Sequence, residues 1–427
     1  MIGRALAHGA AAALVVAGVV AQVFRPLAPA LGPLPSPERW FDTAHLERVA
    51  AYHQPLYAVA LAALAVRVAV PCLAALSNVG RRRVDWMVAR VGARRPARAA
   101  AAVVVAVVAL TDVVLLPIAF WAGYVHERAF GFQTQGPAGW FRDWAVATAI
   151  SWLTVALLTL GGWTLVRRLP RSWPAAAGLT GAVLTAVTAL GSPLVLEPLF
   201  LSTRSLEPGP VRAEVGRVLE AADLEVGQIL VADASHRTTK ENAYVSGLGA
   251  TRRIVLYDTL LTGRPPPEVG LVLAHELGHV RNADIVRAVL LAGAGTVVLA
   301  YGLAGLVRWR ARRGRQDGQA DPRAAAVVLT AVVIAGVLAL PVQQAASRRI
   351  EAAADLAALN LTQDPSTYVS MHLGLARSNL TDPAPPTSVT FLWKSHPPPV
   401  ARLAMGERWP FASYGQGSAR IRAEPWP

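Results

Sequence analysis

Seven long apolar stretches constrain the fold of this chain more than any other feature. Each one is long enough to cross the roughly 30 Å hydrocarbon core of a bilayer as a helix. They run over Leu6–Phe24, Leu56–Leu76, Ala101–Tyr124, Ala145–Val166, Ala175–Leu196, Ile285–Val307 and Ala324–Ala346. Tryptophans lie near several of their ends, where a membrane–water interface favours them. We therefore predict an integral membrane protein with seven helices that span the bilayer.

The first stretch, Leu6–Phe24, has a second interpretation. Arg4 precedes it and small residues around Ala28–Ala30 follow it, which is the order found in a cleaved signal peptide. The apolar run is longer than the usual core of such a signal. We therefore favour a membrane helix and keep cleavage as the alternative.

The composition supports a membrane location and argues against a nucleic-acid partner. Hydrophobic residues make up 54% of the chain, charged residues make up 16%, and the formal net charge is +14. Soluble proteins are about one quarter charged. The arginines cluster beside the apolar stretches, without the aromatic-rich basic patches that bind nucleic acid. The single cysteine, Cys72, excludes an intrachain disulfide and a metal site with two or more thiolates.

Two ionisable residues fall within predicted spans, Asp112 in the third stretch and Arg67 in the second. Charged groups at such depth usually face the interior of a bundle or a water-filled cavity. Two interpretations stay open. The two side chains line a polar chamber, or they pair with each other or reach the interface.

Two long segments lack the character of a membrane span. In the first, residues 197–284, we predict a helix at Val211–Ala222 and strands at Gln228–Ala232 and Arg253–Tyr257. A further helix, Glu268–Arg281, is predicted directly after a run of prolines. The second segment, residues 347–427, is predicted to open with the alanine-rich helix Ser347–Asn360 and to end in proline-rich coil.

The predicted helix 268–281 carries the motif H-E-x-x-H, formed by His275, Glu276 and His279. Histidines four residues apart lie on one face of a helix, so that both imidazoles can bind one ion. Zinc in a catalytic site has three protein ligands and keeps a fourth position open. It lowers the pKa of its bound water, and a carboxylate such as Glu276 can then act as the general base.

The third protein ligand is predicted on the helix Ser347–Asn360. Glu351 and Asp355 lie four residues apart on it and share one face. Glu351 suits a metal ligand. Asp355 suits a supporting role, in which it accepts the free N–H of a ligating histidine and fixes the tautomer. The alternative for this pair is a solvated acidic face.

These motifs resemble peptidase family M48, in its branch of Ste24-like CAAX prenyl proteases. That family combines H-E-x-x-H with a later E-x-x-x-D, which are read here at 275–279 and 351–355. Further similar strings stand at 123–131, 197–200, 242–244, 253–261 and 395–398. The resemblance implies a bundle around a large internal chamber, with the zinc site at one end.

The resemblance also implies roles for further residues. Asn242 and Tyr244 would lie on a strand edge that pairs with an extended peptide substrate. His396 and Arg402 would stabilise the oxyanion of the tetrahedral intermediate. Asp355 would be an accessory acid or a supporting residue. The tail after about Ala404 has no recognisable family feature.

The predicted fold class is mainly α, a seven-helix transmembrane bundle with a small discontinuous α+β zincin-like catalytic lobe. The predicted domains are residues 1–196 with five spans, 197–284 with the H-E-x-x-H helix, 285–346 with two spans, 347–405 with the third ligand, and the tail 406–427. The predicted function is that of a zinc metalloendopeptidase with one Zn²⁺ per chain and a peptide or membrane-protein substrate. The alternative is a non-catalytic scaffold or transporter with a structural zinc site, which would need a fourth protein ligand.

The orientation in the cell membrane rests on the arginines of the short loops. One side carries sixteen, and these are Arg81, Arg82, Arg83, Arg90, Arg94, Arg95, Arg98, Arg167, Arg168, Arg171, Arg308, Arg310, Arg312, Arg313, Arg315 and Arg323. The other side carries five, and these are Arg25, Arg39, Arg48, Arg128 and Arg142. The positive-inside rule places the richer side in the cytoplasm and the catalytic lobe outside it. The resemblance implies a lobe in the cytosol, and we favour the charge argument.

Overall fold

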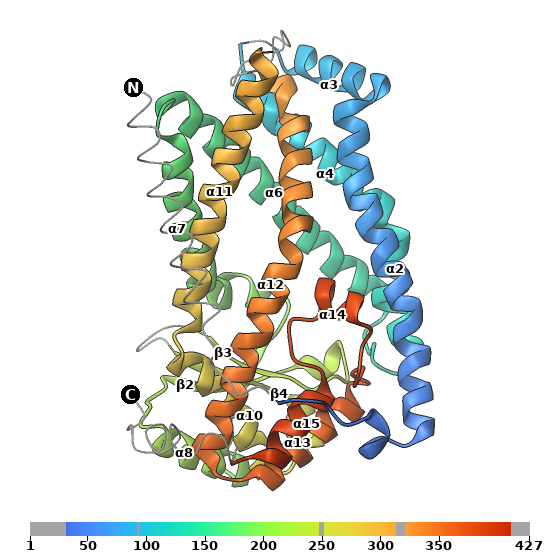
Figure 1. Ribbon diagram of the computed structural model, residues 1–427, viewed down its shortest axis with the longest axis vertical. Helices are drawn as coiled ribbons and strands as arrows, with labels where there is room; N and C mark the ends of the chain where they lie inside the picture. Colours follow the sequence, from blue (N-terminus) through green and yellow to red (C-terminus); the bar gives the residue numbers. More distant parts are fainter. Residues whose placement is uncertain (1–30, 93, 247–251, 313–320, 411–427) are drawn as a thin grey trace.

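The computed structural model of the 427-residue chain describes residues 31–92, 94–246, 252–312 and 321–410. Long helices form a bundle that occupies most of the height of the molecule, and a mixed α/β lobe lies at one end of it (Figure 1). The first predicted stretch, Leu6–Phe24, lies outside the described residues. The tail after residue 410 lies outside them as well.

The bundle is built from the predicted apolar stretches. Within the described residues, five helices are long and apolar enough to cross a membrane. The helices of the bundle are α2 (Thr43–Leu76), α4 (Pro96–Phe120), α6 (Pro137–Arg168), α7 (Trp173–Val195), α11 (Asp284–Arg312) and α12 (Ala325–Thr362). In α7 the apolar run that the structure describes is shorter than a full span. The predicted membrane bundle is confirmed, whereas the count of seven spans is not confirmed by the described residues.

Shorter helical elements complete the bundle. A π-helix, Trp121–His126, and the single turn α5 (Glu127–Ala129) extend α4 towards the lobe. The helix α3 (Asn78–Val91) lies at the end of the bundle opposite the lobe (Figure 1). It begins where the Ser77 side chain accepts a hydrogen bond from a backbone N–H in its first turn. The segment that the sequence analysis treated as a loop is therefore largely helical.

Glycines bring α7 and α11 into close contact. A β-carbon at Gly178 would come within 2.0 Å of the Val297 side chain, and one at Gly181 would come within 2.5 Å of Thr296. On the other helix, Gly293 faces α7 in the same way. Small residues at such an interface let two helix backbones approach within a membrane, where packing drives association.

The lobe contains a four-stranded sheet in the order β1-β2-β4-β3. The strands are β1 (Thr203–Ser205), β2 (Gln228–Ala232), β3 (Ala243–Ser246) and β4 (Arg253–Tyr257). Strands β2 and β4 pair in parallel, whereas β1 and β3 pair antiparallel to their neighbours. The bounds of β2 and β4 are those predicted. Strand β3 lies at an edge of the sheet, next to α10 (Pro266–Arg281).

Apolar residues of β4, α10 and the C-terminal helices form the core of the lobe. Ile254, Leu273, Leu277, Tyr368 and Met371 are each at most 1% exposed. The helix α8 (Pro210–Ala221) covers α10 from another side. Because α10 is packed on all sides, the direction of its H-E-x-x-H face is fixed by the core of the lobe.

The last membrane helix and the alanine-rich helix are one continuous element. We predicted a span ending at Ala346 and a separate helix beginning at Ser347, and this separation is wrong. The structure has the single 38-residue helix α12. No glycine or proline occurs between residues 342 and 362, so nothing in the sequence interrupts the helical hydrogen bonds. The helix ends at Gln363, which has a left-handed conformation with φ of 55°.

The C-terminal segment is helical where we predicted proline-rich coil. Three helices follow α12, and they are α13 (Pro365–Ser378), α14 (Thr387–Trp393) and α15 (Pro399–Arg408). Proline is the first residue of α13 and of α15, and Pro386 directly precedes α14. Proline has no N–H to lose at the first position of a helix, so it starts these helices. The prediction failed because the prolines of this segment were not taken as helix starts, as those before Glu268 were.

Asp112 and Arg67 do not pair with each other. The Asp112 carboxylate accepts a hydrogen bond from the indole N–H of Trp152 on α6, at 2.8 Å. Arg67 is exposed on α2. Of the alternatives left open by the sequence, the direct ion pair is therefore wrong.

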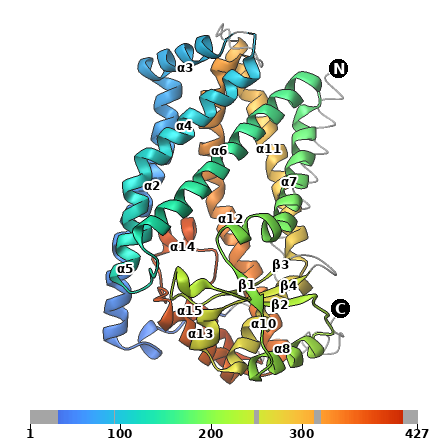
Figure 2. The ribbon, with the colours of Figure 1, turned by 180° about the vertical axis from the view of Figure 1, so that it is seen from behind.

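Polar contacts tie the lobe to the bundle. The Lys240 ammonium lies 2.7 Å from the carboxylate of Glu127, beyond the π-helix. The Tyr57 hydroxyl on α2 donates to Asp382 at 2.5 Å. Figure 2, which shows the molecule from behind, places α2 and α5 beside the lobe at this end of the bundle. The position of the lobe under the bundle is thus fixed by side chains from both.

Candidate metal centre and active site

Helices α10 and α12 pack against each other and bring the two predicted motifs together. The Nε2 atom of His275 lies 3.3 Å from one carboxylate oxygen of Glu351. The Nε2 atom of His279 lies 3.6 Å from the other oxygen. Gly278 allows this contact, because a β-carbon there would come within 2.9 Å of the Ala354 backbone. Two imidazoles and one carboxylate therefore converge on one point.

An aspartate holds the other ring nitrogen of each histidine. The Nδ1 atom of His275 lies 2.9 Å from Asp355, which is fully buried. The Nδ1 atom of His279 lies 2.9 Å from Asp284. A carboxylate in this position makes Nδ1 the protonated nitrogen and leaves the Nε2 lone pair free for a cation. Both histidines are thus oriented as a metal centre requires.

Arg402 lies behind His275. Its Nε atom donates to Asp355 at 2.8 Å, and its Nη2 atom also donates to this carboxylate. Nη2 is 3.4 Å from the Nδ1 atom of His275, on the side away from Glu351. The buried His372 lies 3.6 Å from the same carboxylate through its Nε2 atom. Asp355 is therefore the centre of a charged cluster that supports one histidine.

Glu276 lies between the centre and the sheet. It offers an oxygen within 4.8 Å of ligand atoms of His275 and His279. The backbone N–H of Val245, in the edge strand β3, lies near its carboxylate. Burial raises the pKa of Glu276 above its ordinary value, although the nearby histidines and this N–H oppose this effect. A carboxylate in such an environment is suited to accepting and returning a proton.

The residues assigned from the resemblance lie around this centre. The Nε2 atom of His396, in the loop between α14 and α15, is 3.2 Å from Glu351, and its side chain is largely exposed. Tyr244 lies in β3, where burial and the nearby Glu197 raise the pKa of its hydroxyl, while Asn242 directly precedes the strand. Thus β3 and the His396 loop border the centre, whereas Arg402 contacts it only through Asp355 and His275.

The chemistry of this donor set fits a divalent cation. The Oε2 atom of Glu351 is buried and has no hydrogen-bond partner among the described residues, although two histidine nitrogens face this carboxylate. Burial lowers the pKa of His275, but Asp355 and Glu351 outweigh it and raise this pKa to about 10. The surroundings therefore favour positive charge at this point. Nitrogen and carboxylate oxygen are ligands that zinc takes.

Asp284 is a functional residue that the sequence did not lead us to predict. This residue begins α11, and Ala283, with φ of 53°, forms the sharp turn that brings it back to His279. The signal available in the sequence was a carboxylate five residues after the second histidine. Without the turn, that spacing gives no reason to expect contact, since residues five apart on a helix do not share a face.

Comparison with known proteins agrees with this geometry. Residues 205–409 match the model of peptidase family M48, and residues 35–202 match that of the CAAX prenyl protease N-terminal region with five membrane helices. The crystal structure of S. mikatae Ste24p superposes with a TM-score of 0.74 at 18% identity, over 94% of this chain and 97% of that one. At this level of identity, the superposition with Ste24p shows a shared fold.

Two curated relatives illustrate the range of similarity. An uncharacterized metalloprotease of Bacillus subtilis, YhfN, is 26% identical over 70% of this chain and 71% of its own. CAAX prenyl protease 1 of Saccharomyces cerevisiae is 27% identical over 44% of this chain, and the match spans 42% of the yeast protein. The similarity to the yeast protein thus covers less than half of either chain.

The fold and the site define the class of this protein as an integral-membrane metalloendopeptidase. The two family matches together extend over nearly all of residues 35–409. The chain belongs to peptidase family M48, and within it the chain resembles the Ste24-like CAAX prenyl proteases. Five helices with the length and composition of membrane spans make it a multi-pass membrane protein.

Proposed function

We propose that this protein is a zinc endopeptidase whose ligands are His275, His279 and Glu351, with one Zn²⁺ per chain. The observation that carries the proposal is the approach of both Nε2 atoms, at 3.3 and 3.6 Å, to the two oxygens of Glu351. Bound zinc would supply Lewis acidity and an activated water. Glu276 also lies near the histidines, but Glu351 supplies the carboxylate ligand in this proposal, so we assign Glu276 to proton transfer.

Glu276 is the general base in this proposal. Its carboxylate takes a proton from the attacking water and gives it to the leaving amine as the peptide bond breaks. Its raised pKa brings the group closer to neutral pH, where acceptance and release of a proton are more nearly balanced.

Asp355, Asp284 and Arg402 are positioning residues. The two aspartates fix the rings of His275 and His279 through their Nδ1 atoms. Arg402 neutralises and orients Asp355, and its engagement there favours this role over direct contact with an oxyanion. The exposed His396, on the open side next to Glu351, is better placed to stabilise developing negative charge.

The substrate is an extended peptide or a segment of a membrane protein. We place it along β3, whose outer edge pairs with no other strand of the sheet. Asn242 and Tyr244 belong to this edge, and β-addition there would carry a peptide past Glu276. The catalytic lobe in this proposal is discontinuous and combines residues 197–284 with residues 347–405.

Replacing Glu276 by glutamine tests the reaction. The variant keeps the ligand set, so it should retain its metal and lose about 10²–10⁴-fold in turnover of a quenched fluorescent peptide. Glu220→Gln on the exposed face of α8 is the matched control and should behave as the wild type. Wild-type turnover by Glu276→Gln would instead favour a structural metal in a non-catalytic protein.

The orientation is proposed from charge. The arginine-rich α3 and the start of α4 lie at the end opposite the lobe, which would place the lobe outside the cytoplasm. A C-terminal fusion measures this directly. Alkaline phosphatase should be active and GFP dark when each is attached after residue 427. A fluorescent GFP fusion with inactive phosphatase would place the lobe in the cytosol.

A further inference from the structure

A groove lined by arginines lies at the end of the bundle away from the active site. The start of α4 and the last turn of α6 form its walls and enclose about 730 Å³. Its arginines are Arg94, Arg95, Arg98, Arg167 and Arg168, and all five are exposed. Within the part of the chain that the structure describes, none of the five has an acidic partner. The groove therefore holds concentrated positive charge.

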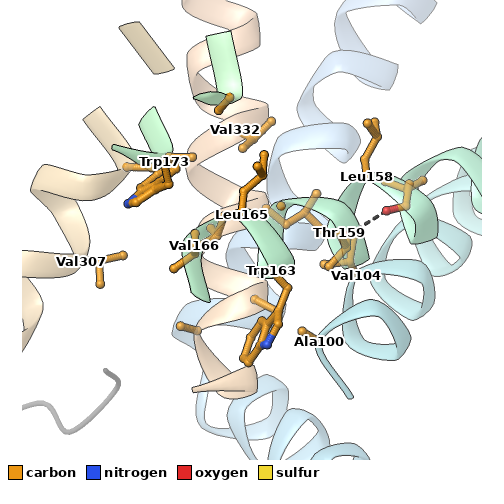
Figure 3. Close-up of a pocket in the computed structure, with 18 of the residues that line it drawn as sticks. Ala100, Val104, Leu158, Thr159, Trp163, Leu165, Val166, Trp173, Val307 and Val332 are labelled. Atoms are coloured by element: carbon orange, nitrogen blue, oxygen red, sulfur yellow. Dashed lines mark hydrogen bonds between the residues drawn. The ribbon is translucent and has the colours of Figure 1, made fainter. Parts of the chain in front are cut away.

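An apolar cavity of about 350 Å³ adjoins this groove. It lies between α4, α6, α7, α11 and α12, and Figure 3 shows side chains such as Leu158, Leu165 and Val332 gathered around it. The one acidic residue in its lining, Asp321, is already within ion-pair distance of Arg323. The cavity thus suits a hydrocarbon chain.

Trp163 joins the two spaces, since it lines both the groove and the cavity. In Figure 3 its indole lies at one end of the cavity, beside Ala100. The indole N–H is buried and finds no acceptor among the described protein groups. A tryptophan at a membrane interface normally donates to a polar group at headgroup level. Trp163 therefore forms the wall at which the basic groove and the apolar cavity meet.

We propose that this site binds an anionic phospholipid, with its phosphate among the arginines and part of one acyl chain in the cavity. Arginine binds phosphate through paired N–H donors, and each basic residue near the surface adds attraction for anionic lipid. The ester region would lie beside the Trp163 ring, where the two spaces meet. The site shares no residue with the metal centre, so it is independent of the proposed catalytic function.

Native mass spectrometry of the full-length protein in detergent tests the site. The probes are dioleoylphosphatidylglycerol and dioleoylphosphatidylcholine, which share the same chains and differ in charge. We expect the anionic lipid to bind more tightly. The variant Arg94→Gln/Arg95→Gln/Arg98→Gln should weaken its binding about tenfold or more. The variant Arg167→Gln/Arg168→Gln should act in the same direction and provides a second measurement if the first fails to fold.

The matched charge control is Arg81→Gln/Arg82→Gln/Arg83→Gln. It removes the same three charges from α3, at the same end of the bundle but outside the groove. If this control weakens binding of the anionic lipid equally, the binding depends on general surface charge and the proposal is overturned. Equal binding of the two lipids by the wild type would overturn it as well.

Two variants on α6 test whether the acyl chain of the lipid lies in the apolar cavity. A β-carbon would meet open space at both Gly161 and Gly162, but only Gly162 lines the cavity. Gly162→Leu should reduce binding of the anionic lipid, and Gly161→Leu should leave it unchanged. Glycerol 3-phosphate supplies the headgroup chemistry without a chain. Full displacement of the lipid by equimolar glycerol 3-phosphate, or equal effects of the two leucines, would refute a chain in the cavity.

Discussion

Replacing Asp355 by asparagine should weaken metal binding and destabilise the metal-free protein at the same time. Asp355 is fully buried and accepts hydrogen bonds from His275 and from two nitrogens of Arg402. Asparagine keeps the shape and one oxygen acceptor, but it removes the negative charge. The change therefore affects the orientation of a ligand and the pairing of a buried cation together.

The two effects have different expected sizes. Loss of a partner that orients a metal ligand costs about 10–100-fold in affinity. Breaking a buried ion pair costs about 3–5 kcal/mol, and the retained amide oxygen favours the lower end of that range. The Arg402 side chain is only 16% exposed, so water can replace little of the lost interaction.

Asp284→Asn is the matched comparison, because Asp284 makes the same contact with the other histidine, at the same distance of 2.9 Å. Its cationic partner, Arg287, is 3.4 Å away and more exposed than Arg402. Loss of such a pair costs about 1 kcal/mol or less. Both variants should therefore lose similar metal affinity, and only Asp355→Asn should lose much stability without metal.

Two measurements separate these effects. Competition with a chromophoric chelator gives zinc affinity, and thermal unfolding in detergent with excess chelator gives stability without metal. If both variants lower the unfolding temperature equally, the Arg402 pair is not the source of the added stability. If Asp355→Asn binds zinc as tightly as the wild type, Asp355 does not orient His275.

Two further variants test the ligand set and the bundle. Glu351→Ala should reduce the metal content from about one ion per chain to near zero, measured by elemental analysis, because two histidines alone make an incomplete site; unchanged content would reassign the third ligand to Glu276. Gly178→Leu should lower the unfolding temperature, because its side chain would overlap Val297 on α11. Gly302→Leu, where a β-carbon meets open space, is the control, and an equal loss there would show that the α7–α11 contact is not special.

Local sequence patterns were enough for the elements that pack directly around the metal centre. The predicted bounds of β2 and β4 match the structure, since short β-branched runs between turn residues have few alternatives. The H-E-x-x-H helix was placed to within two residues at its start, at Pro266 instead of Glu268. Helical spacing also put Glu351 and Asp355 on one face of α12.

Contacts between distant parts of the chain were beyond such patterns. Arg402 faces Asp355 because α15 packs against α13 and α12, and no spacing within α15 indicates this. The turn at Ala283 that brings Asp284 to His279 requires a positive φ that alanine rarely adopts. In both cases tertiary packing selects the local geometry, and the sequence of the segment alone contains no signal for it.

The continuity of α12 explains how the metal centre is placed relative to the membrane. Pro341 lies within this helix, and Glu351 follows it by ten residues, which is about 15 Å along a helix axis. The third ligand is therefore carried on an extension of a membrane helix, while both histidines belong to the lobe. Closing the centre requires the lobe to dock against the bundle, through contacts such as Lys240 with Glu127. A metal bound between α10 and α12 would in turn favour the docked arrangement, because binding stabilises the state that presents all three ligands.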